Sequence, residues 1–128
     1  MRYLAAFSFG QNNGSVIYPK VLAHSMTVKE VLDGLEKFTD EDMLAAFNGG
    51  KAAAIKEIVD KEGAIQFVPG SFTQKGAQAA YTESPTVGQL KEKLKPLPGD
   101  TRVIWRYEGI AAPVYGLTKV GPGGQRVP

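Results

Sequence analysis

Two segments of the chain, 27–38 and 86–97, carry apolar residues at the three- and four-residue spacing of a helix with one buried face. Each segment opens on a threonine, Thr27 or Thr86, with a Glu or Gln three residues later, which is the spacing of a capping box. The pattern therefore predicts two capped amphipathic helices. Their sequences, TVKEVLDGLEKF and TVGQLKEKLKPL, share a pattern that fits an internal duplication, although any capped amphipathic helix gives a similar one.

Strand patterns stand near both ends of the chain. Segment 2–9 is apolar and aromatic and precedes the turn signal GQNNG, so 15–18 is expected to return beside it as the second strand of a hairpin. Segment 102–107 alternates two sets of side chains, and the turn at Glu108 and Gly109 should lead into a second strand that ends near Val120. The apolar run AIQFV predicts one more strand between these hairpins.

The middle of the chain is predicted to be helical. Thr39 and the acidic residues after it are typical of a helix start, where the helix dipole favours negative charge. Two glycines then interrupt the pattern, and segment 51–61 reads as a further helix with isoleucines inward and lysines outward.

The expected fold is therefore α+β, with antiparallel β-hairpins from the N- and C-terminal segments, which could share one sheet, and three to four short helices packed on one face. Residues 1–120 are expected to form a single domain, and residues 121–128 a flexible tail. Segment 69–84 lacks a clear element and is predicted to be a long loop that retains Phe72 and Tyr81.

Composition narrows the function classes. The chain has 128 residues, 43% hydrophobic and 22% charged, which is typical of an ordinary soluble domain. A net charge of +2 is too small to indicate nucleic-acid or membrane binding by bulk electrostatics, and the absence of cysteine excludes thiolate chemistry. Since no apolar stretch approaches the ~20 residues that span a bilayer, we expect a soluble, cytoplasmic protein.

No group of residues points to catalysis. His24 is the one histidine, and the acidic run at 40–42 is explained by the predicted helix start. Phosphate-binding, nucleophile-elbow and metal-helix motifs are not found. We therefore expect no enzymatic activity, no cofactor and no metal site.

Segment 41–61 resembles a helix-turn-helix, the motif in which a second helix reads the DNA major groove. Ala45 would let the helices cross, Gly49 would form the turn, and the isoleucines of 51–61 would be core contacts. Asn48 and Gly50 depart from the motif, since apolar side chains usually flank the turn glycine. The resemblance implies DNA contacts by Lys51 and Lys56 on the second helix.

Aromatic and arginine side chains suggest a second kind of surface. Trp105 and Tyr107 fall on one face of the 102–107 strand, and Arg102 and Arg106 fall on the other, which is expected to face outward. Tyrosine, tryptophan and arginine are enriched at the energetic centres of protein interfaces. The residues expected to contact a partner are Phe72, Tyr81, Arg102 and Arg106.

The sequence therefore favours a non-enzymatic binding or accessory protein that contacts another protein or copies of itself. DNA binding through 41–61 is the alternative, for which Lys51 and Lys56 are the candidate residues. The compact layout also resembles that of small phage or mobile-element proteins, which adds a capsid or tail accessory subunit as a third hypothesis.

Overall fold

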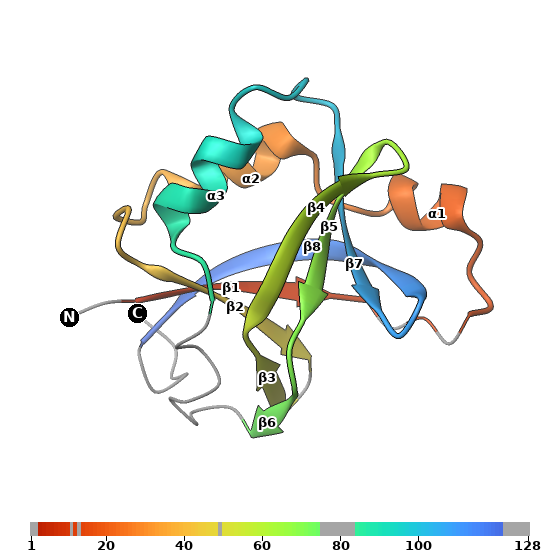
Figure 1. The fold of residues 1–128 in the computed structure, drawn as a ribbon, viewed down its shortest axis with the longest axis horizontal. Coiled ribbons are helices and arrows are strands. Elements are labelled where there is room, and N and C mark those ends of the chain that lie inside the picture. The colour runs from red at the N-terminus through yellow and green to blue at the C-terminus, as the bar shows by residue number, and fades with distance from the viewer. Residues whose placement is uncertain (1–2, 11, 13, 49, 75–83, 122–128) are drawn as a thin grey trace.

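The computed structural model describes residues 3–10, 12, 14–48, 50–74 and 84–121. Strands make up 45% of this part of the chain and helices 21%, the latter in three short helices (Figure 1). In chain order the elements are β1 (Leu4–Phe9), α1 (Tyr18–Ala23), α2 (Val28–Leu35), β2 (Met43–Asn48), β3 (Lys51–Ala53), β4 (Ile55–Lys61), β5 (Ala64–Pro69), β6 (Thr73–Gln74), α3 (Val87–Leu94), β7 (Arg102–Tyr107) and β8 (Ile110–Val120). No helix in the described part of the chain is both long and apolar enough to cross a membrane.

The strands form one mixed sheet in the order β4-β5-β7-β8-β1-β2-β3-β6. The pairs β1/β2 and β5/β7 are parallel, and the other neighbours are antiparallel. β3 pairs with β2 and β4 pairs with β5, yet Ala54 alone separates β3 from β4 in the chain. The bent segment 51–61 therefore carries the chain from β3, which lies next to the edge strand β6, to β4 at the opposite edge, and the sheet curls into a half-barrel.

The two halves of the chain are built alike. Each half contains a strand, a helix with a capping box, a second strand parallel to the first, and then an eleven-residue segment. In the first half these are β1, α2, β2 and 51–61, and in the second half they are β5, α3, β7 and β8. Both eleven-residue segments change partner midway: β8 pairs first with β7 and then with β1, as 51–61 pairs first with β2 and then with β5. Both contain a register shift at the same point, opposite the end of β1 or β5.

Backbone hydrogen bonds between the halves are reciprocal. The Val28 N–H donates to the Thr101 carbonyl at 2.7 Å, and the corresponding Val87 N–H donates to the Asp42 carbonyl at 2.8 Å. The matching bonds at the ends of β1 and β5 join Gly10 to Pro113 and Gly70 to Ala54, both at 2.8 Å. Each half thus makes the same hydrogen bonds to the other half. Such reciprocal contacts are typical of approximate two-fold symmetry. This arrangement supports the internal duplication suggested by segments 27–38 and 86–97.

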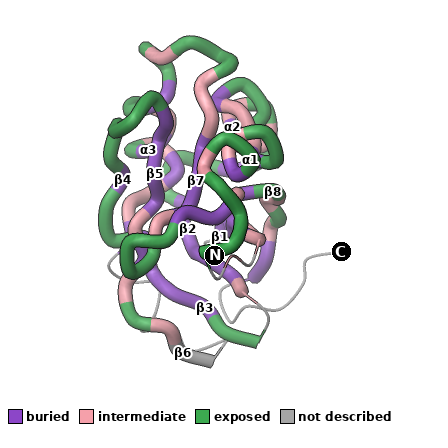
Figure 2. The backbone as a smooth tube through the Cα atoms, turned by 90° about the vertical axis from the view of Figure 1, so that its right-hand side faces the viewer, coloured by how far each residue is buried: buried purple, intermediate pink, exposed green. Residues whose placement is uncertain are grey.

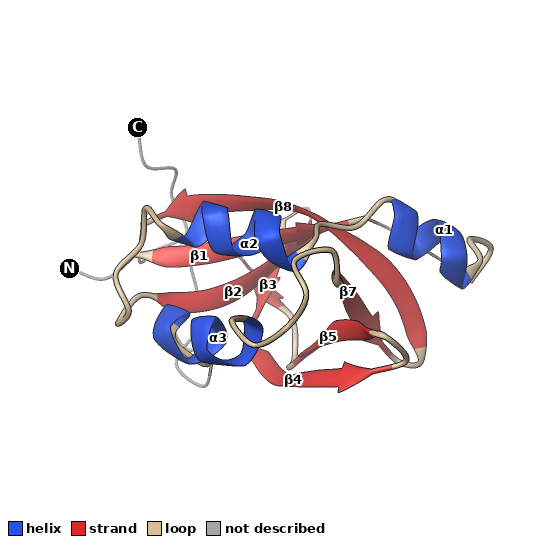
Figure 3. Cartoon of the chain, turned by 90° about the horizontal axis from the view of Figure 1, so that it is seen from above, coloured by secondary structure: helices blue, strands red, loops and turns tan. Residues whose placement is uncertain are grey.

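The main core lies inside the curled sheet. α2 and α3 lie next to each other on one side of it, and α1 lies apart from them (Figure 3). The caps of α2 and α3 are those predicted, since Thr27 and Thr86 both form complete capping boxes. The apolar face of each of these two helices is buried, as predicted. Figure 2 shows buried residues along β5 and β7, whereas β4 is largely exposed. The largest fully buried side chains include Phe7, Phe67, Leu35 and Leu94.

α1 covers the opposite face of β7. Its Val21 packs in a small apolar cluster with Ala64, Ile104 and Ala111. Both faces of β7 are therefore covered where Trp105 and Ile104 lie, although sequence reasoning expected one face to point outward.

The predicted fold class is wrong, because three to four helices do not pack on one face of a sheet. Segments 39–47 and 51–61, predicted as helices, contain β2, β3 and β4 instead. Ile55 and Ile58 stand three residues apart, which suggested a helix, but both are buried in β4 because the register shift between Ile55 and Glu57 changes the strand's alternation. Tertiary pairing here overrides the helical preference of the alanines at 45, 46, 52, 53 and 54.

The helix-turn-helix interpretation fails for the same reason, because 41–61 contains no helix among its described residues. The predicted return strand at 15–18 is also wrong: Tyr18 begins α1, with Pro19 in its first turn. The strands at 64–68 and 102–107 and the return strand to Val120 are confirmed. The predicted tail lies outside the described residues apart from Gly121.

Candidate functional site

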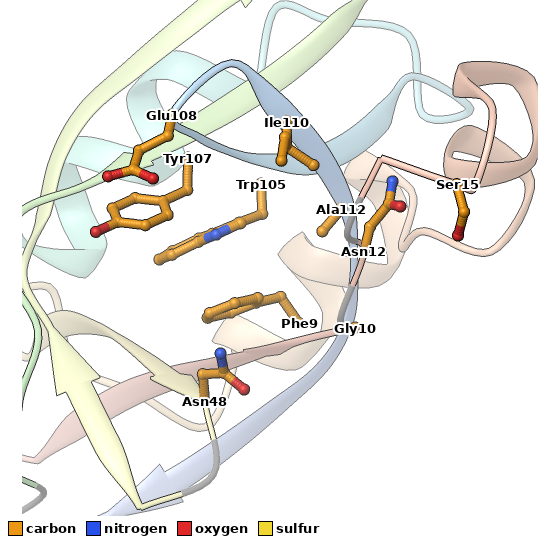
Figure 4. Close-up of a pocket in the computed structure, with 10 residues that line it drawn as sticks. All are labelled: Phe9, Gly10, Asn12, Ser15, Asn48, Trp105, Tyr107, Glu108, Ile110 and Ala112. Carbon is orange, nitrogen blue, oxygen red and sulfur yellow. The ribbon is translucent and has the colours of Figure 1, made fainter.

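A pocket of about 490 Å³ lies where β1, β2 and β7 end and β8 begins (Figure 4). The residues that line it are Phe9, Gly10, Asn12, Ser15, Asn48, Trp105, Tyr107, Glu108, Ile110 and Ala112. β1 and β2 run parallel, and the β7–β8 turn reaches over the same end of the molecule, so three chain segments distant in sequence meet there. The volume falls within the range of sites that accept a small ligand or an anchoring side chain.

Stacked aromatic rings form one side of the pocket. The rings of Phe9 and Trp105 stack with centroids 3.8 Å apart, and Phe72 meets Tyr107 edge to face at 5.3 Å. Phe72 also lies 5.9 Å from Trp105 and 6.3 Å from Phe9, so the four rings form one aromatic cluster. Such pairs add about 0.5–1.5 kcal/mol each beyond simple burial, which holds the rings in fixed positions.

The pocket is deep on the side of Trp105 and open on the side of the β7–β8 turn. Trp105 and Phe9 are 2% and 6% exposed, whereas Tyr107 and Ile110 expose 39% and 38% of their surface. Figure 4 shows Ile110, Ala112 and Asn12 across the pocket from the rings. The site thus has an aromatic floor and an apolar rim that reaches solvent.

Asn12 fixes the loop that closes the pocket beside Ile110. Its side-chain amide donates to the Ala111 carbonyl at 2.7 Å and to the Val16 carbonyl at 3.2 Å, and its oxygen accepts from the backbone of Gly14 and Val16. The loop after β1 is therefore tied to β8, although no strand pairing joins them. Val16 and Ile17, both exposed, follow in the chain.

The carboxamide of Asn48 and the carboxylate of Glu108 are among the polar groups of the pocket that have no hydrogen-bond partner among the described residues. Asn48 is half-buried at the end of β2, and Glu108 is exposed in the turn between β7 and β8. Glu108 is also the one charged residue of the ten that line the pocket.

The four residues predicted to bind a partner do not form one surface. Phe72 lies in the aromatic cluster and is half-buried, and Tyr81 falls outside the described residues. Arg102 donates to the Ser25 carbonyl at 2.8 Å, and Arg106 donates to Gln66 Oε1 and the Gly109 carbonyl, both at 3.2 Å. Both guanidinium groups are thus held within the fold, on the face of β7 opposite the pocket.

Arg106 belongs to a polar cluster beside α1. Its Nη2 lies 3.6 Å from Glu62 Oε2, an ion-pair separation too long for a hydrogen bond, and its guanidinium lies 5.9 Å from the Tyr18 ring centroid. Burial raises the pKa of the Tyr18 hydroxyl, the Glu62 carboxylate adds to this, and Arg106 opposes it. These contacts attach α1 to the sheet and give Arg106 a structural role.

The other singled-out residues are separate from the pocket. Lys51 and Lys56 are exposed on β3 and β4, and Lys56 occupies the register shift. His24 follows α1 as its C-cap. Asp42 is buried and accepts hydrogen bonds from the backbone of Tyr3 and Thr39, both at 2.9 Å. No group of three or more potential metal ligands occurs among the described residues.

Sequence reasoning placed Trp105 and Tyr107 together but missed the rest of the pocket. Phe9 and Asn48 come from strands whose neighbours in the sheet could not be foreseen, because β2 was predicted as a helix. Asn12 lies in the segment GQNNG, whose composition predicts a hairpin turn and gives no sign of a pocket. The one available signal was Pro19, which favours a helix start and argues against a strand at 15–18.

The chain was compared with protein-family models, with curated proteins and with solved structures, and no match was found in any of the three.

Proposed function

We propose that this protein is a non-enzymatic binding protein that captures a segment of another protein in the aromatic pocket. The observation that carries the proposal is the pocket's combination of a rigid aromatic floor with an apolar rim open to solvent. Interface energy concentrates where an anchoring side chain fills a pocket lined by tyrosine and tryptophan.

The distribution of exposed apolar residues supports a protein partner. Six large apolar side chains are exposed in the described part of the chain: Val16, Ile17, Val59, Tyr107, Ile110 and Tyr115. Tyr107 and Ile110 line the pocket, and Val16 and Ile17 directly follow Ser15, which also lines it. Apolar surface that gathers at one place, rather than being scattered singly, is typical of an interaction site.

The carboxamide of Asn48 supports a polypeptide ligand in particular. It offers two donors and an acceptor, and none of these is used by a described residue. A peptide group presents one donor and one acceptor, which is the complement of a carboxamide. A segment of chain with an apolar anchor can therefore satisfy Asn48 while its side chain enters the pocket.

The residue types in the pocket favour binding over catalysis. Its ten residues include one carboxylate and no histidine, lysine or cysteine. General acid–base and nucleophilic catalysis require a reactive group beside a second group that activates it.

A selection from displayed random twelve-residue peptides tests the proposal. Trp105 is the one tryptophan of the chain, so its fluorescence reports occupancy of the pocket that it lines. Ile110→Thr should weaken selected peptides about fivefold, since it removes partly exposed apolar contact area. Val59→Thr is the matched control, because Val59 is 39% exposed on β4 and does not line the pocket.

The proposal fails if selection enriches no peptide over an unselected pool, or if Ile110→Thr and Val59→Thr have equal effects on the affinity. Self-association is the alternative form of protein binding, and sizing distinguishes it. If a second copy occupies the pocket, the wild type will be oligomeric and Ile110→Thr monomeric at the same concentration.

A further inference from the structure

We propose that the segment captured by the pocket carries a lysine or arginine side chain, whose cation lies between the Glu108 carboxylate and the Tyr107 ring. This inference rests on the proposed function and adds the chemistry of the partner.

The first observation is the charge of the pocket. Glu108 is the one charged residue among the ten that line it, so the pocket presents a single negative charge at its open side. Lys51 is the cross-strand neighbour of Asn48, but it is exposed and does not line the pocket. A cationic side chain is the complement of this arrangement.

The second observation is a comparison of two glutamates in turns of the same conformation. Glu62 and Glu108 each open a two-residue turn between antiparallel strands, each with a left-handed backbone, at φ 56° and 50°, and each followed by a glycine with positive φ. The carboxylate of Glu62 lies 3.6 Å from Arg106, so it has a cationic partner. The carboxylate of Glu108 has none among the described residues. Of these two glutamates in turns of the same conformation, Glu62 has a cationic partner within the fold, and Glu108, at the pocket, is left for an external cation.

The third observation is the Tyr107 ring. It precedes Glu108, is 39% exposed, and is held edge to face against Phe72 at 5.3 Å. A fixed and partly exposed aromatic face attracts a cation by about 0.5–1 kcal/mol at such sites. Arg106, the nearest arginine in sequence, is held on the opposite face of β7 by Gln66 and cannot fill this position.

The same peptide selection tests the inference, now through the composition of the enriched peptides and two glutamine variants. The enriched peptides should share a lysine or arginine beside an apolar residue. Glu108→Gln should weaken a synthetic selected peptide about five- to tenfold, as expected for a lost ion pair and a weakened cation site. Glu62→Gln, which removes the same charge from a turn of the same conformation away from the pocket, should leave the affinity unchanged. Thermal melting checks that both variants are folded.

A second synthetic peptide, with norleucine in place of the basic residue, isolates the cation. Its affinity for the wild type should be no higher than that of the original peptide for Glu108→Gln, because norleucine also loses the attraction to the Tyr107 ring, and it should be insensitive to the Glu108 substitution.

The two proposals fail separately. Enriched peptides without a basic residue, or equal affinities for wild type and Glu108→Gln, overturn the cation site but leave the protein-binding function. No enrichment at all removes both. If N-acetyl-lysine amide alone binds as tightly as the full peptide, the pocket is a small-molecule site and the docking proposal is overturned.

Discussion

The rings of Phe7 and Phe67 meet edge to face with centroids 4.9 Å apart, and the two residues hold matching places in β1 and β5. Phe7 is the fourth residue of its strand and Phe67 the fourth of the other, and both are completely buried. The centre of the core is therefore formed by one residue from each repeat.

Because each ring packs against its counterpart, Phe7→Ala and Phe67→Ala should each lower the free energy of unfolding by about 3–5 kcal/mol. The double variant should lose about 0.5–1.5 kcal/mol less than the sum, since the ring–ring contact is lost only once. Urea denaturation measures this. If an alanine variant does not fold, the same cycle with leucine applies, and strict additivity would contradict a direct coupling.

The capping boxes of α2 and α3 differ in one titratable group, Glu30. We therefore expect the two caps to differ in how their contribution to stability changes with pH. Hydrogen bonds from Thr27 to the Glu30 carboxylate lower its pKa below the ordinary 4.5, whereas Gln89 holds the matching position of α3 without charge. A folded-state pKa below the unfolded one stabilises the protein above about pH 4.5, and this part is lost as pH falls through the folded value. Glu30→Gln should therefore flatten the dependence of Tm on pH between 3 and 6.

The reciprocal substitution is the control for this effect. Gln89→Glu should add an acid-sensitive part of the same sign, because the carboxylate would accept the same backbone hydrogen bond from Thr86 that the Gln89 amide oxygen accepts at 2.8 Å. Equal pH profiles for the wild type and Glu30→Gln would mean that the carboxylate makes no contribution through its cap.

Gly10 and Gly70 are equivalent, but their surroundings are not. A Cβ at Gly10 would lie 2.9 Å from Pro113 Cγ, part of a ring that cannot rotate away, whereas at Gly70 the nearest atom is Lys56 Cγ at 3.3 Å on a flexible chain. Gly10→Ala should therefore destabilise by about 1–3 kcal/mol and Gly70→Ala by clearly less. Chemical denaturation of both variants tests this, and equal losses would contradict it.

The turns at Glu62–Gly63 and Glu108–Gly109 both require a left-handed first residue, which asparagine adopts more readily than glutamate. Glu108→Asn should raise the free energy of unfolding by about 0.5–1 kcal/mol. Glu62→Asn should gain less, because it also removes the ion pair with Arg106. A larger gain at position 62, measured by thermal melting, would show that this ion pair contributes nothing.

The sequence predicts α2, α3, β7 and β8 correctly, because capping residues, turn residues and strand alternation determine these elements locally. Thr27 and Thr86 start α2 and α3, and the alternation at 102–107 and its turn give β7 and β8. The middle segment could not be predicted in this way, because Leu44, Ala45, Ala46 and Phe47 are all buried in β2 and show no alternation. Such a run fits a strand covered on both faces as well as a helix, and only pairing with β1 decides between them.

The pocket was less predictable than the fold. Trp105 and Tyr107 share a strand face, which the sequence shows, but Phe9 reaches Trp105 only through the pairing of β8 with both β1 and β7. The turn at Glu108 is confirmed, but its place beside the pocket depends on how β1, β2, β7 and β8 pair, which the sequence does not show.

The repeat also shows where the chain can be reconnected. Lys61 pairs with Ala64 across a two-residue turn, and the matching pair in the other half is Val120 with Leu4, near the two ends of the chain. A circular permutant that opens at Glu62–Gly63 and joins Val120 to Leu4 by an Asn-Gly turn would exchange the roles of the two repeats while keeping every strand pair. The pair Val120 and Leu4 thus takes in one repeat the place that the two strand ends joined by the Glu62–Gly63 turn take in the other.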